Sequence, residues 1–317
     1  MFHTKIKFLY ENAFGVFAAI YKNMIKNKKP HLKKLDPNAN KYSRGTAAIS
    51  AGSYGMAGAA ILCCKAAALS GAGLIKAELK PEIYNITAVS LPTVVFCKKE
   101  NLLNKANALL IGPGCADTVD FEFLNSFYES FYEKNLKNSS NNINTTETVL
   151  SYIPMVLDAD ALNFIAKNKK SEEEKFEIFK KYGNNIIITP HEGEMARLLN
   201  ITAEEVHSNR LKYAQILSNK YKITTVLKGK NTICCNGLNE VYINKTDSPV
   251  LATAGSGDVL SGIIVSLSAQ GYSAYNAACL GVLIHGLLGK YASKKYGIST
   301  TAENLLEFIP RALKKLK

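Results

Sequence analysis

The sequence predicts one α/β domain with three layers (α/β/α) and a central, mainly parallel sheet. Three observations support this prediction. From about residue 45, short apolar runs alternate with helical patterns along the chain. These runs are nearly continuous, which is typical of parallel strands covered by helices on both faces. With 317 residues and a hydrophobic fraction of 47%, the chain is also long enough to bury a large core.

The individual elements follow from the periodicity of each segment. We expect strands over the continuous apolar runs at 46–52, 108–112, 155–159, 185–190 and 224–229. We expect helices where apolar residues recur every three to four positions, at 58–73, 194–200, 208–222, 253–271 and 274–292. The last two helices are apolar enough to be buried, and we interpret His285 as a core histidine with satisfied hydrogen bonds. The Asn-rich segment 135–148 is typical of a surface loop.

The N-terminus falls outside this alternation. Residues 1–35 are predicted to form a helical extension, and the main domain is expected over 36–317. Within the extension, residues 5–29 combine an apolar middle with basic flanks and favour an amphipathic helix that docks on this domain or on a partner. A signal peptide is the weaker interpretation, because Glu11 and Asn12 interrupt the apolar run.

Composition argues against several classes of protein. There is no run of 18 apolar residues, so we expect no membrane-spanning helix. The seven cysteines form no C-x-x-C motif, which favours a reducing cytoplasm over a disulfide framework or a zinc knuckle. The net charge is +13, but only four of the 39 basic residues are arginine. Because recognition of phosphates and bases favours arginine, we expect no nucleic-acid partner, only an attraction for anionic small molecules.

Standard phosphate and metal motifs are absent. The chain has no Walker A motif, and glycines 52, 55 and 58 are spaced by three, which does not fit the dinucleotide pattern G-x-G-x-x-G. His191 and Glu192 begin like the zinc motif H-E-x-x-H, but Met195 stands at its last position. No G-x-S-x-G motif is present. The side chains therefore predict no resident metal site.

A different phosphate-binding device precedes the first buried C-terminal helix. The segment Ala-Gly-Ser-Gly-Asp at 254–258 allows a sharp turn, after which backbone N–H groups and the positive end of the helix face an anion. Asp258 falls in the first helical turn, where a carboxylate can accept a proton from an attacking hydroxyl. The alternative interpretation is a plain helix cap, since Ser and Asp both favour helix N-termini.

Polar residues also follow three of the predicted strands. They lie at 158–163 (Asp-Ala-Asp-Ala-Leu-Asn), at 189–194 (Thr-Pro-His-Glu-Gly-Glu) and at 227–232 (Leu-Lys-Gly-Lys-Asn-Thr). Because the carboxyl ends of strands in an open α/β sheet converge on a ligand crevice, these side chains are candidate ligand contacts. The alternatives are strand caps and solvated turns for the acidic segments, and an ordinary hairpin turn for 227–232.

Eight segments occur in an order that is typical of one known family. They are KYSRG (41–45), AGSYGMAGAA (51–60), SGAGL (70–74), IGPG (111–114), LDADALN (157–163), TPHEGEMARL (189–198), LKGKNT (227–232) and GSGDVLSG (255–262). Together they resemble the ADP/ATP-dependent NAD(P)H-hydrate dehydratases, which repair hydrated nicotinamide cofactors. The resemblance covers about residues 36–317 and implies a ribokinase-like fold. The epimerase domain that is fused to the N-terminus of many members does not fit within residues 1–35.

The resemblance also implies a reaction and its residues. Family members use ADP or ATP with Mg²⁺ to phosphorylate the hydroxyl of the hydrated nicotinamide ring, and phosphate then leaves as the double bond returns. The implied activity here is ADP-dependent dehydration of the S-epimer of NADH-hydrate or NADPH-hydrate, releasing AMP and phosphate. Asp258 is the implied base. The implied nucleotide-binding residues are Lys228, Gly229, Lys230, Asn231, Thr232, Gly255, Ser256 and Gly257, and the implied hydrate-binding residues are Ala59, Gly114, His191 and Asp258.

Details of the match refine these implications. His191 followed by Glu192 resembles the bacterial, ADP-using form, so ADP is the implied phosphoryl donor and ATP the alternative. Ala254 stands where many members have glycine, which tightens the turn but leaves the three following amides in place. Because relatives are homo-oligomers, the resemblance also implies a tetramer or larger assembly.

Three other hypotheses stay open at this point. A ribokinase-like kinase for a small molecule such as hydroxyethylthiazole or hydroxymethylpyrimidine has the same glycine-rich turn and aspartate, but its product stays phosphorylated. A nucleotide-binding protein without catalysis does not need Asp258. A nucleic-acid binder is the weakest of the three.

Overall fold

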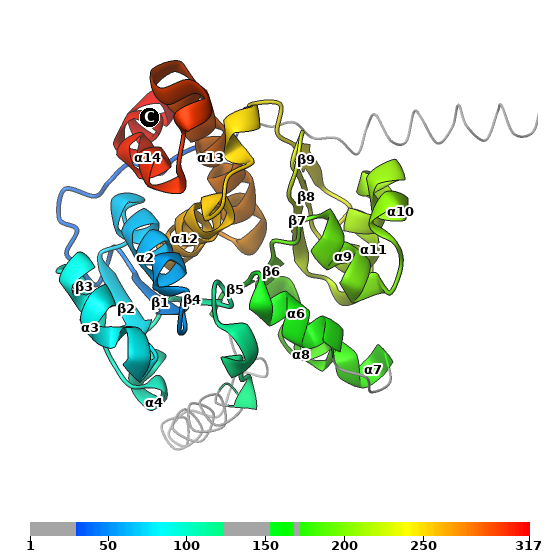
Figure 1. Cartoon of the computed structure of the whole chain (residues 1–317), viewed down its shortest axis with the longest axis horizontal. Coiled ribbons are helices and arrows are strands. Elements are labelled where there is room, and N and C mark those ends of the chain that lie inside the picture. The colour runs from blue at the N-terminus through cyan, green and yellow to red at the C-terminus, as the bar shows by residue number, and fades with distance from the viewer. Residues whose placement is uncertain (1–29, 123, 125–152, 168–171) are drawn as a thin grey trace, which may run out of the picture.

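One sheet forms the centre of the structure, a computed structural model that describes residues 30–122, 124, 153–167 and 172–317 (Figure 1). In these residues the sheet has nine strands in the order β3-β2-β1-β4-β5-β6-β7-β8-β9. Neighbouring strands from β3 to β7 are parallel, and β8 and β9 are antiparallel to their neighbours. Their bounds are β1 (Thr46–Ser50), β2 (Leu74–Glu78), β3 (Val94–Phe96), β4 (Ala108–Ile111), β5 (Met155–Leu157), β6 (Ile186–Ile188), β7 (Thr224–Leu227), β8 (Ile233–Cys235) and β9 (Val241–Ile243).

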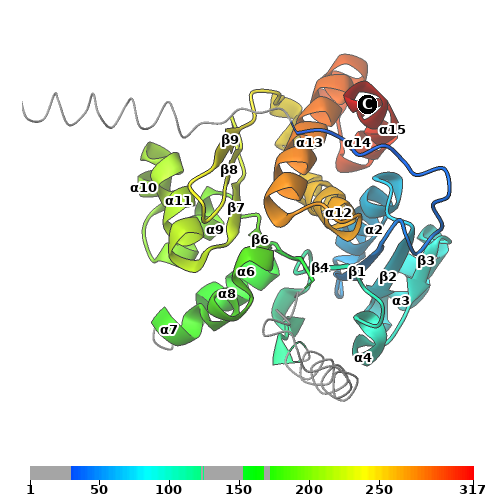
Figure 2. The same cartoon turned by 180° about the vertical axis from the view of Figure 1, so that it is seen from behind.

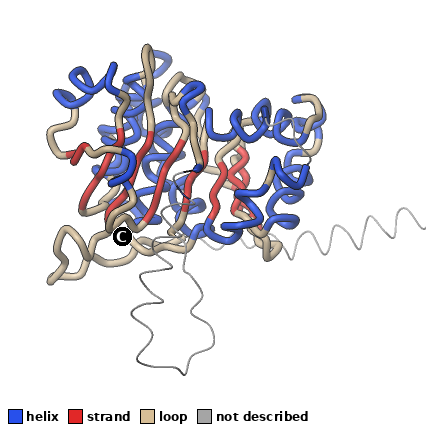
Figure 3. Tube along the Cα trace, turned by 90° about the horizontal axis from the view of Figure 1, so that it is seen from below, coloured by secondary structure: helices blue, strands red, loops and turns tan. Residues whose placement is uncertain are grey.

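Helices cover the sheet on both faces. Figures 1 and 2 show α2, α12 and α13 on one side of the strands and α6, α9 and α11 on the other, and Figure 3 shows the strands side by side between them. The described helices are α2 (Ala57–Leu69), α3 (Pro81–Ser90), α4 (Lys99–Leu102), α6 (Asp160–Lys167), α7 (Glu172–Lys175), α8 (Glu177–Tyr182), α9 (Glu192–Leu199), α10 (Ala203–Ser208), α11 (Arg210–Tyr221), α12 (Ser256–Ala269), α13 (Ala274–Tyr296), α14 (Ala302–Glu307) and α15 (Ile309–Leu316).

The continuous apolar runs of the strands supply two separate cores. In β1, Ala47 belongs to the core beneath α2, α12 and α13, whereas Ala48 belongs to the core beneath α6, α9 and α11. In β4, Leu110 and Leu109 divide in the same way, and all four side chains are fully buried. Because successive side chains of a strand point to opposite faces, a strand covered on both sides must be apolar at every position. The predicted three-layer architecture is confirmed.

All the strands and helices predicted from periodicity are present. The five strands are β1, β4, β5, β6 and β7, and the five helices are α2, α9, α11, α12 and α13. Strands β2, β3, β8 and β9 were not predicted. Lys76 and Glu78 interrupt the apolar run of β2, so this strand does not show the continuous apolar pattern.

Part of the N-terminal prediction is wrong. Residues 30–35 form an irregular segment, not a helix. The backbone N–H of Lys33 donates to the hydroxyl of Tyr272 at 2.6 Å, a long-range bond that takes the place of a helical one. Residues 1–29 and the predicted loop at 135–148 lie outside the described residues, so these predictions and the domain boundary at residue 36 stay predictions. Within the described part of the chain, no helix has both the length and the apolar character needed to span a membrane.

The strand order creates a topological switch point between β1 and β4. From β1 the chain moves outward through β2 to β3, and β4 then returns to the other side of β1. Open α/β sheets bind ligands in the crevice beyond the carboxyl ends of the strands at such a point. Here the two loops that leave these strands are joined, because Gly52 N–H donates to Pro113 O and Ser53 Oγ donates to Gly114 O, both at 2.8 Å. The glycine-rich segments therefore lie together at the switch point.

Helix α12 packs very closely against α2 at Gly262. A Cβ atom at this position would lie 2.4 Å from the carbonyl oxygen of Cys63 and 2.8 Å from the Cβ of Ala66. Glycine therefore allows the two backbones to approach closely, and this approach sets the position of the helix that begins at the GSGD segment.

We expect Gly262→Ala to destabilise the protein. Helix propensity alone favours alanine by about 1 kcal/mol, but the added methyl group overpacks the contact with α2 at a cost of about 1–3 kcal/mol. The net free energy of unfolding should therefore fall, measured by urea denaturation. Gly58→Ala is the matched control, because a Cβ at Gly58 in α2 meets no atom within 4 Å. A Gly262→Ala protein that is more stable than the wild type would contradict this account of the packing.

Candidate active site

The carboxyl ends of the parallel strands lie at one edge of the sheet and present the polar segments there. Asp158 follows β5, His191 lies three residues beyond β6, and Lys228 directly follows β7. The N-terminus of α12, which carries Asp258, meets the same edge, because Lys228 and Asp158 approach its first turn at Gly257. The structure thus brings together segments that are far apart in the sequence.

The first turn of α12 has the backbone form that the glycine-rich segment predicts. Gly255 precedes the helix in the left-handed region (φ +81°), and no side chain caps the helix. A Cβ at Gly255 would lie 2.5 Å from Cδ1 of Leu62, so space also requires glycine. The alternative interpretation, in which the serine or aspartate of this segment caps the helix through its side chain, is therefore wrong. One of the three implied phosphate-binding amides is already engaged, since Ser256 N–H donates to Thr253 O at 3.2 Å.

Asp258 has an altered acidity. The pKa of Asp258 is raised to about 7, and burial is the largest cause of this rise. The negative charge of Asp158 raises the pKa further, and the positive charge of Lys228 opposes the rise. A carboxyl group with this pKa exchanges its proton near neutral pH. It has the property required of a general base.

A buried ion pair lies beside Asp258. Lys228 Nζ donates to Asp158 Oδ1 at 2.8 Å, and Ser261 Oγ of α12 donates to Asp158 Oδ2 at 2.5 Å. Glu194 Oε2 is 3.7 Å from the same ammonium group. Burial lowers the pKa of Lys228, but the charges of Asp158 and Glu194 outweigh it and hold that pKa above its usual value. Lys228 therefore stays charged beside the first turn of α12.

Lys228 connects the implied nucleotide loop to that turn. A Cβ at Gly257 would lie 3.4 Å from Lys228 Nζ, so the ammonium group sits over the predicted phosphate site. Beyond Lys228, residues 229–232 form the turn between the antiparallel strands β7 and β8. The alternative interpretation of 227–232 as a hairpin turn is thus correct for the backbone. A hairpin turn at this position is compatible with nucleotide binding. Within the turn, Thr232 Oγ1 donates to Gly229 O at 2.8 Å and Asn231 N–H donates to Asp247 Oδ2 at 2.8 Å.

Two implied hydrate-binding residues meet at the switch point. Gly114 adopts a positive φ of 64°, and a Cβ there would lie 2.8 Å from the Cβ of Ala59 and 3.0 Å from that of Met56. Ala59 is in the first turn of α2, directly after the glycine-rich turn. Small residues at both positions let the loop after β4 pack closely against the start of α2.

His191 caps helix α9. Its Nδ1 accepts hydrogen bonds from Gly193 N–H (3.0 Å) and Glu194 N–H (3.3 Å), and Glu194 Oε2 accepts from His191 N–H (2.8 Å). Because Nδ1 accepts twice, the proton of the neutral ring is on Nε2, which lies 3.5 Å from Glu194 Oε1. Burial lowers the pKa of His191, so the neutral ring prevails at neutral pH. This helix cap was not predicted, and the half-exposed Nε2 edge of the ring remains available to a ligand.

Sequence reasoning missed several groups that the fold brings here. His285 was predicted to be a core histidine, and its hydrogen-bonding capacity is indeed satisfied, with Nε2 3.0 Å from both Oγ and O of Ser256. Its partner is thus the first residue of α12, and burial lowers the pKa of His285 to about 4. Glu194 and Ser261 were given no individual role either. A possible sequence signal for Ser261 is its position one helical turn after Asp258.

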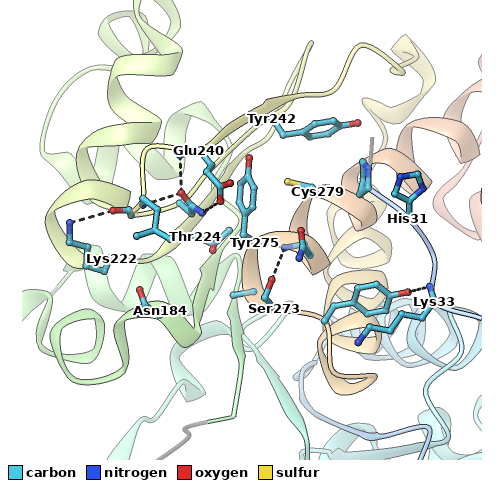
Figure 4. A pocket seen from close by; sticks show the side chains of 17 residues that line it. His31, Lys33, Asn184, Lys222, Thr224, Glu240, Tyr242, Ser273, Tyr275 and Cys279 are labelled. Atoms are coloured by element: carbon cyan, nitrogen blue, oxygen red, sulfur yellow. Dashed lines mark hydrogen bonds between the residues drawn. The ribbon is translucent and has the colours of Figure 1, made fainter. Parts of the chain in front are cut away.

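A pocket of about 610 Å³ lies elsewhere (Figure 4). Residues of the start of β7, the β8–β9 turn and the start of α13 line it, among them Thr224, Glu240 and Tyr275. Because Thr224 begins β7 and Lys228 follows its end, this pocket is at the opposite edge of the sheet. None of the predicted site residues lines it. Among the described residues, no cluster of three His, Cys, Asp or Glu side chains is arranged to hold a metal ion.

Known proteins resemble this chain over most of its length. Two curated relatives are the bifunctional NAD(P)H-hydrate repair enzyme Nnr of Coxiella burnetii, 34% identical over 84% of this chain and 50% of that protein, and the ADP-dependent (S)-NAD(P)H-hydrate dehydratase of Neisseria meningitidis, 31% identical over 85% of both. The chain therefore spans about half the length of the bifunctional relative.

Solved structures agree. An ADP/ATP-dependent NAD(P)H-hydrate dehydratase of Bacillus subtilis, co-crystallised with ATP and Mg²⁺, has a TM-score of 0.70 and 25% identity, covering 90% of this chain and 95% of that one. A ribokinase-like superfamily protein of Enterococcus faecalis, with a TM-score of 0.71 and 22% identity over 90% of this chain and 92% of that one, confirms the ribokinase-like fold. The family model of NAD(P)H-hydrate dehydratases matches residues 47–311. The chain belongs to the NAD(P)H-hydrate dehydratase family.

Proposed function

We propose that this protein is an ADP-dependent dehydratase for the S-epimer of NADH-hydrate or NADPH-hydrate, which returns NADH or NADPH and releases AMP and phosphate. One observation carries the proposal: Lys228, at the start of the nucleotide loop, lies over the first turn of the helix that presents Asp258. A cation, a helix N-terminus and a carboxyl group with a pKa of about 7 are thus combined at the switch-point edge. The name of the Neisseria relative supports ADP as the donor.

In the first step, Asp258 removes the proton from the ring hydroxyl of the hydrate. The oxygen forms a bond to the terminal phosphorus of ADP as the bond from that phosphorus to AMP breaks. Lys228 and the backbone N–H groups at the start of α12 stabilise the negative charge on the transferring group. In the second step the carbon–oxygen bond breaks, phosphate leaves with the bonding electrons, and the adjacent ring carbon loses a proton to restore the double bond. Phosphorylation matters because phosphate is a far better leaving group than hydroxide.

The donor set fits a magnesium ion that enters with the nucleotide. Mg²⁺ in such sites is bound mainly by phosphate oxygens and water, with one or two protein carboxylates, so no cage of protein ligands is needed. Glu194, which lies between His191 and Lys228, is the carboxylate that would complete its coordination. When bound, the ion reduces the negative charge of the phosphates.

We also propose that the protein forms a homotetramer and that it is located in the cytoplasm. The exposed apolar side chains Ile86, Val89 and Val95, on α3 and on the edge strand β3, support self-association. The seven cysteines are all free thiols, as expected in a reducing compartment.

The decisive experiment measures the return of reduced-nicotinamide absorbance when hydrated NADH, Mg²⁺ and ADP are added. We expect full recovery with the wild type and a kcat lowered about 10²–10⁴-fold in Asp258→Asn, because the base is lost. Glu303→Gln, which removes an exposed carboxylate from the first turn of α14, is the matched control. Recovery of absorbance with ATP but not with ADP would overturn the assignment of ADP as phosphoryl donor. A product that stays phosphorylated would identify a small-molecule kinase. Nucleotide that binds without turnover would identify a non-catalytic binding protein.

The pH dependence should follow the acidity of Asp258. The base must be ionised, and its pKa in the folded protein is about 7. We therefore expect kcat/KM to reach half its plateau near pH 7 and to fall about tenfold for each pH unit below that. Steady-state rates between pH 5 and 9, with folding checked by circular dichroism at each pH, test this. A profile that is flat from pH 6 to 8 would exclude Asp258 as the base.

The same acidity predicts a stability effect that needs no substrate. Between pH 4 and 7 the unfolded chain ionises Asp258 but the folded protein does not, so the wild type loses stability as the pH rises through this range. Asp258→Asn cannot ionise and should melt several degrees above the wild type at pH 8, with the difference vanishing near pH 4. Asp117→Asn, which removes an exposed carboxylate, is the control. An Asp258→Asn protein that melts below the wild type at pH 8 would contradict the cost of this buried charge.

A further inference from the structure

One guanidinium group holds the proposed nucleotide loop. Arg210, the first residue of α11, donates from Nη2 to the carbonyls of Leu227 (3.2 Å) and Lys228 (2.9 Å), and from Nη1 to the carbonyl of Lys230. Its side chain is only 15% exposed. A single buried side chain therefore binds three backbone carbonyls at the end of β7 and in the turn that follows.

These bonds orient the peptide groups of the loop. In a planar trans peptide the N–H points opposite to the C=O, so each carbonyl held by Arg210 directs the next N–H away from it. The N–H of Lys228 accordingly donates to Pro190 O, and that of Asn231 donates to Asp247 Oδ2, both at 2.8 Å. By the same geometry, the N–H of Gly229 points away from the guanidinium. Arg210 thus determines which groups the loop presents to a ligand.

Helix stability does not explain a cation at this position. The positive end of a helix disfavours a positive charge in its first turn, and α11 has neither an acidic residue there nor a side-chain cap. The loop is in turn adapted to the guanidinium. Gly229 has a φ of +130°, which strains any other residue, and a Cβ there would lie 2.8 Å from Nη2 of Arg210, so a side chain would displace the guanidinium.

Glu192 forms an ion pair with the guanidinium, although Nε of Arg210 donates no hydrogen bond. Its Oε1 is 3.0 Å from Nε of Arg210, and its Oε2 is 3.1 Å from Nδ1 of His207. Glu192 is the first residue of α9, directly after His191. The Arg210–Glu192 pair therefore joins the nucleotide loop to the helix that begins at the proposed hydrate pocket.

We propose that Arg210 is a positioning residue for the nucleotide, which holds loop 228–232 in its binding conformation and is itself held by Glu192. The proposal rests on the proposed function only in taking this loop as the ADP site. A loop held in one conformation before binding spares the ligand the cost of ordering it. Removal of the clamp should therefore weaken nucleotide binding and leave hydrate binding unchanged.

The test is Mg·ADP binding to the full-length protein, measured by calorimetry, together with both KM values. Arg210→Met keeps the aliphatic stem and removes the donors, and we expect its Kd and KM for ADP to rise on the order of tenfold, with the KM for hydrate within about twofold of wild type. Arg210→Lys should recover only part of the affinity, because a single nitrogen cannot reproduce the planar fork of Nη1 and Nη2 that binds the three carbonyls. Lys212→Met removes one exposed positive charge from the same helix and is the control.

A double-mutant cycle tests the role of Glu192. Glu192→Gln should raise the Kd for ADP less than Arg210→Met does, and should add nothing in the Arg210→Met background. If Arg210→Met fails to fold, Arg210→Lys and Glu192→Gln supply the same comparison. The proposal would be overturned if Arg210→Met left the Kd for ADP unchanged or raised the KM for hydrate as much as the KM for ADP. Full affinity for ADP in Arg210→Lys would also overturn it. A wild type that binds Mg·ADP but forms no NADH would overturn the proposed function and not this one, whereas a wild type that does not bind Mg·ADP would overturn both.

Discussion

The ion pair between Lys228 and Asp158 is the interaction on which the organisation of the site depends. It joins the ends of β5 and β7, and through Ser261 it fixes both to α12. Asp158 is only 1% exposed, so its charge is tolerable only because Lys228, Ser261 and the N–H of Ala159 all bind it. A buried carboxylate that loses such a partner costs roughly 3–5 kcal/mol. The ammonium group is thereby held where a phosphoryl group would be transferred.

The same arrangement explains the acidity of Asp258. Burial does most to raise the pKa of Asp258, the nearby carboxylate of Asp158 raises it further, and Lys228 offsets this only in part. The folded protein therefore contains a less stable ionised form of Asp258, and this carboxyl group exchanges its proton near neutral pH. The neighbouring imidazole of His285 stays neutral because it is buried, so it adds no positive charge to the first turn of α12.

The site has two halves that are built by different means. At the switch point, hydrogen bonds from Gly52 N–H and Ser53 Oγ join the loops after β1 and β4, and Gly114 packs closely against Ala59. On the other side, a hairpin that departs from the parallel order provides the loop that begins at Lys228. Glu192 and Arg210 connect that loop to helix α9. Close packing at Gly262 places α12 between the halves, so its first turn faces both.

By itself the sequence determined the layers of this protein, because strands covered on both faces are apolar over most of their length. It also made Asp258 a candidate, because glycines directly before an apolar helix mark a helix start. Only the tertiary structure decided which groups meet. Lys228 and Asp158 are 70 residues apart, and His285 and Ser256 are 29 apart. Local periodicity shows which face of a helix or strand is buried. Contacts between distant residues depend instead on the order of the strands and on how closely the helices approach one another. Both are set by packing between segments that are far apart in the sequence.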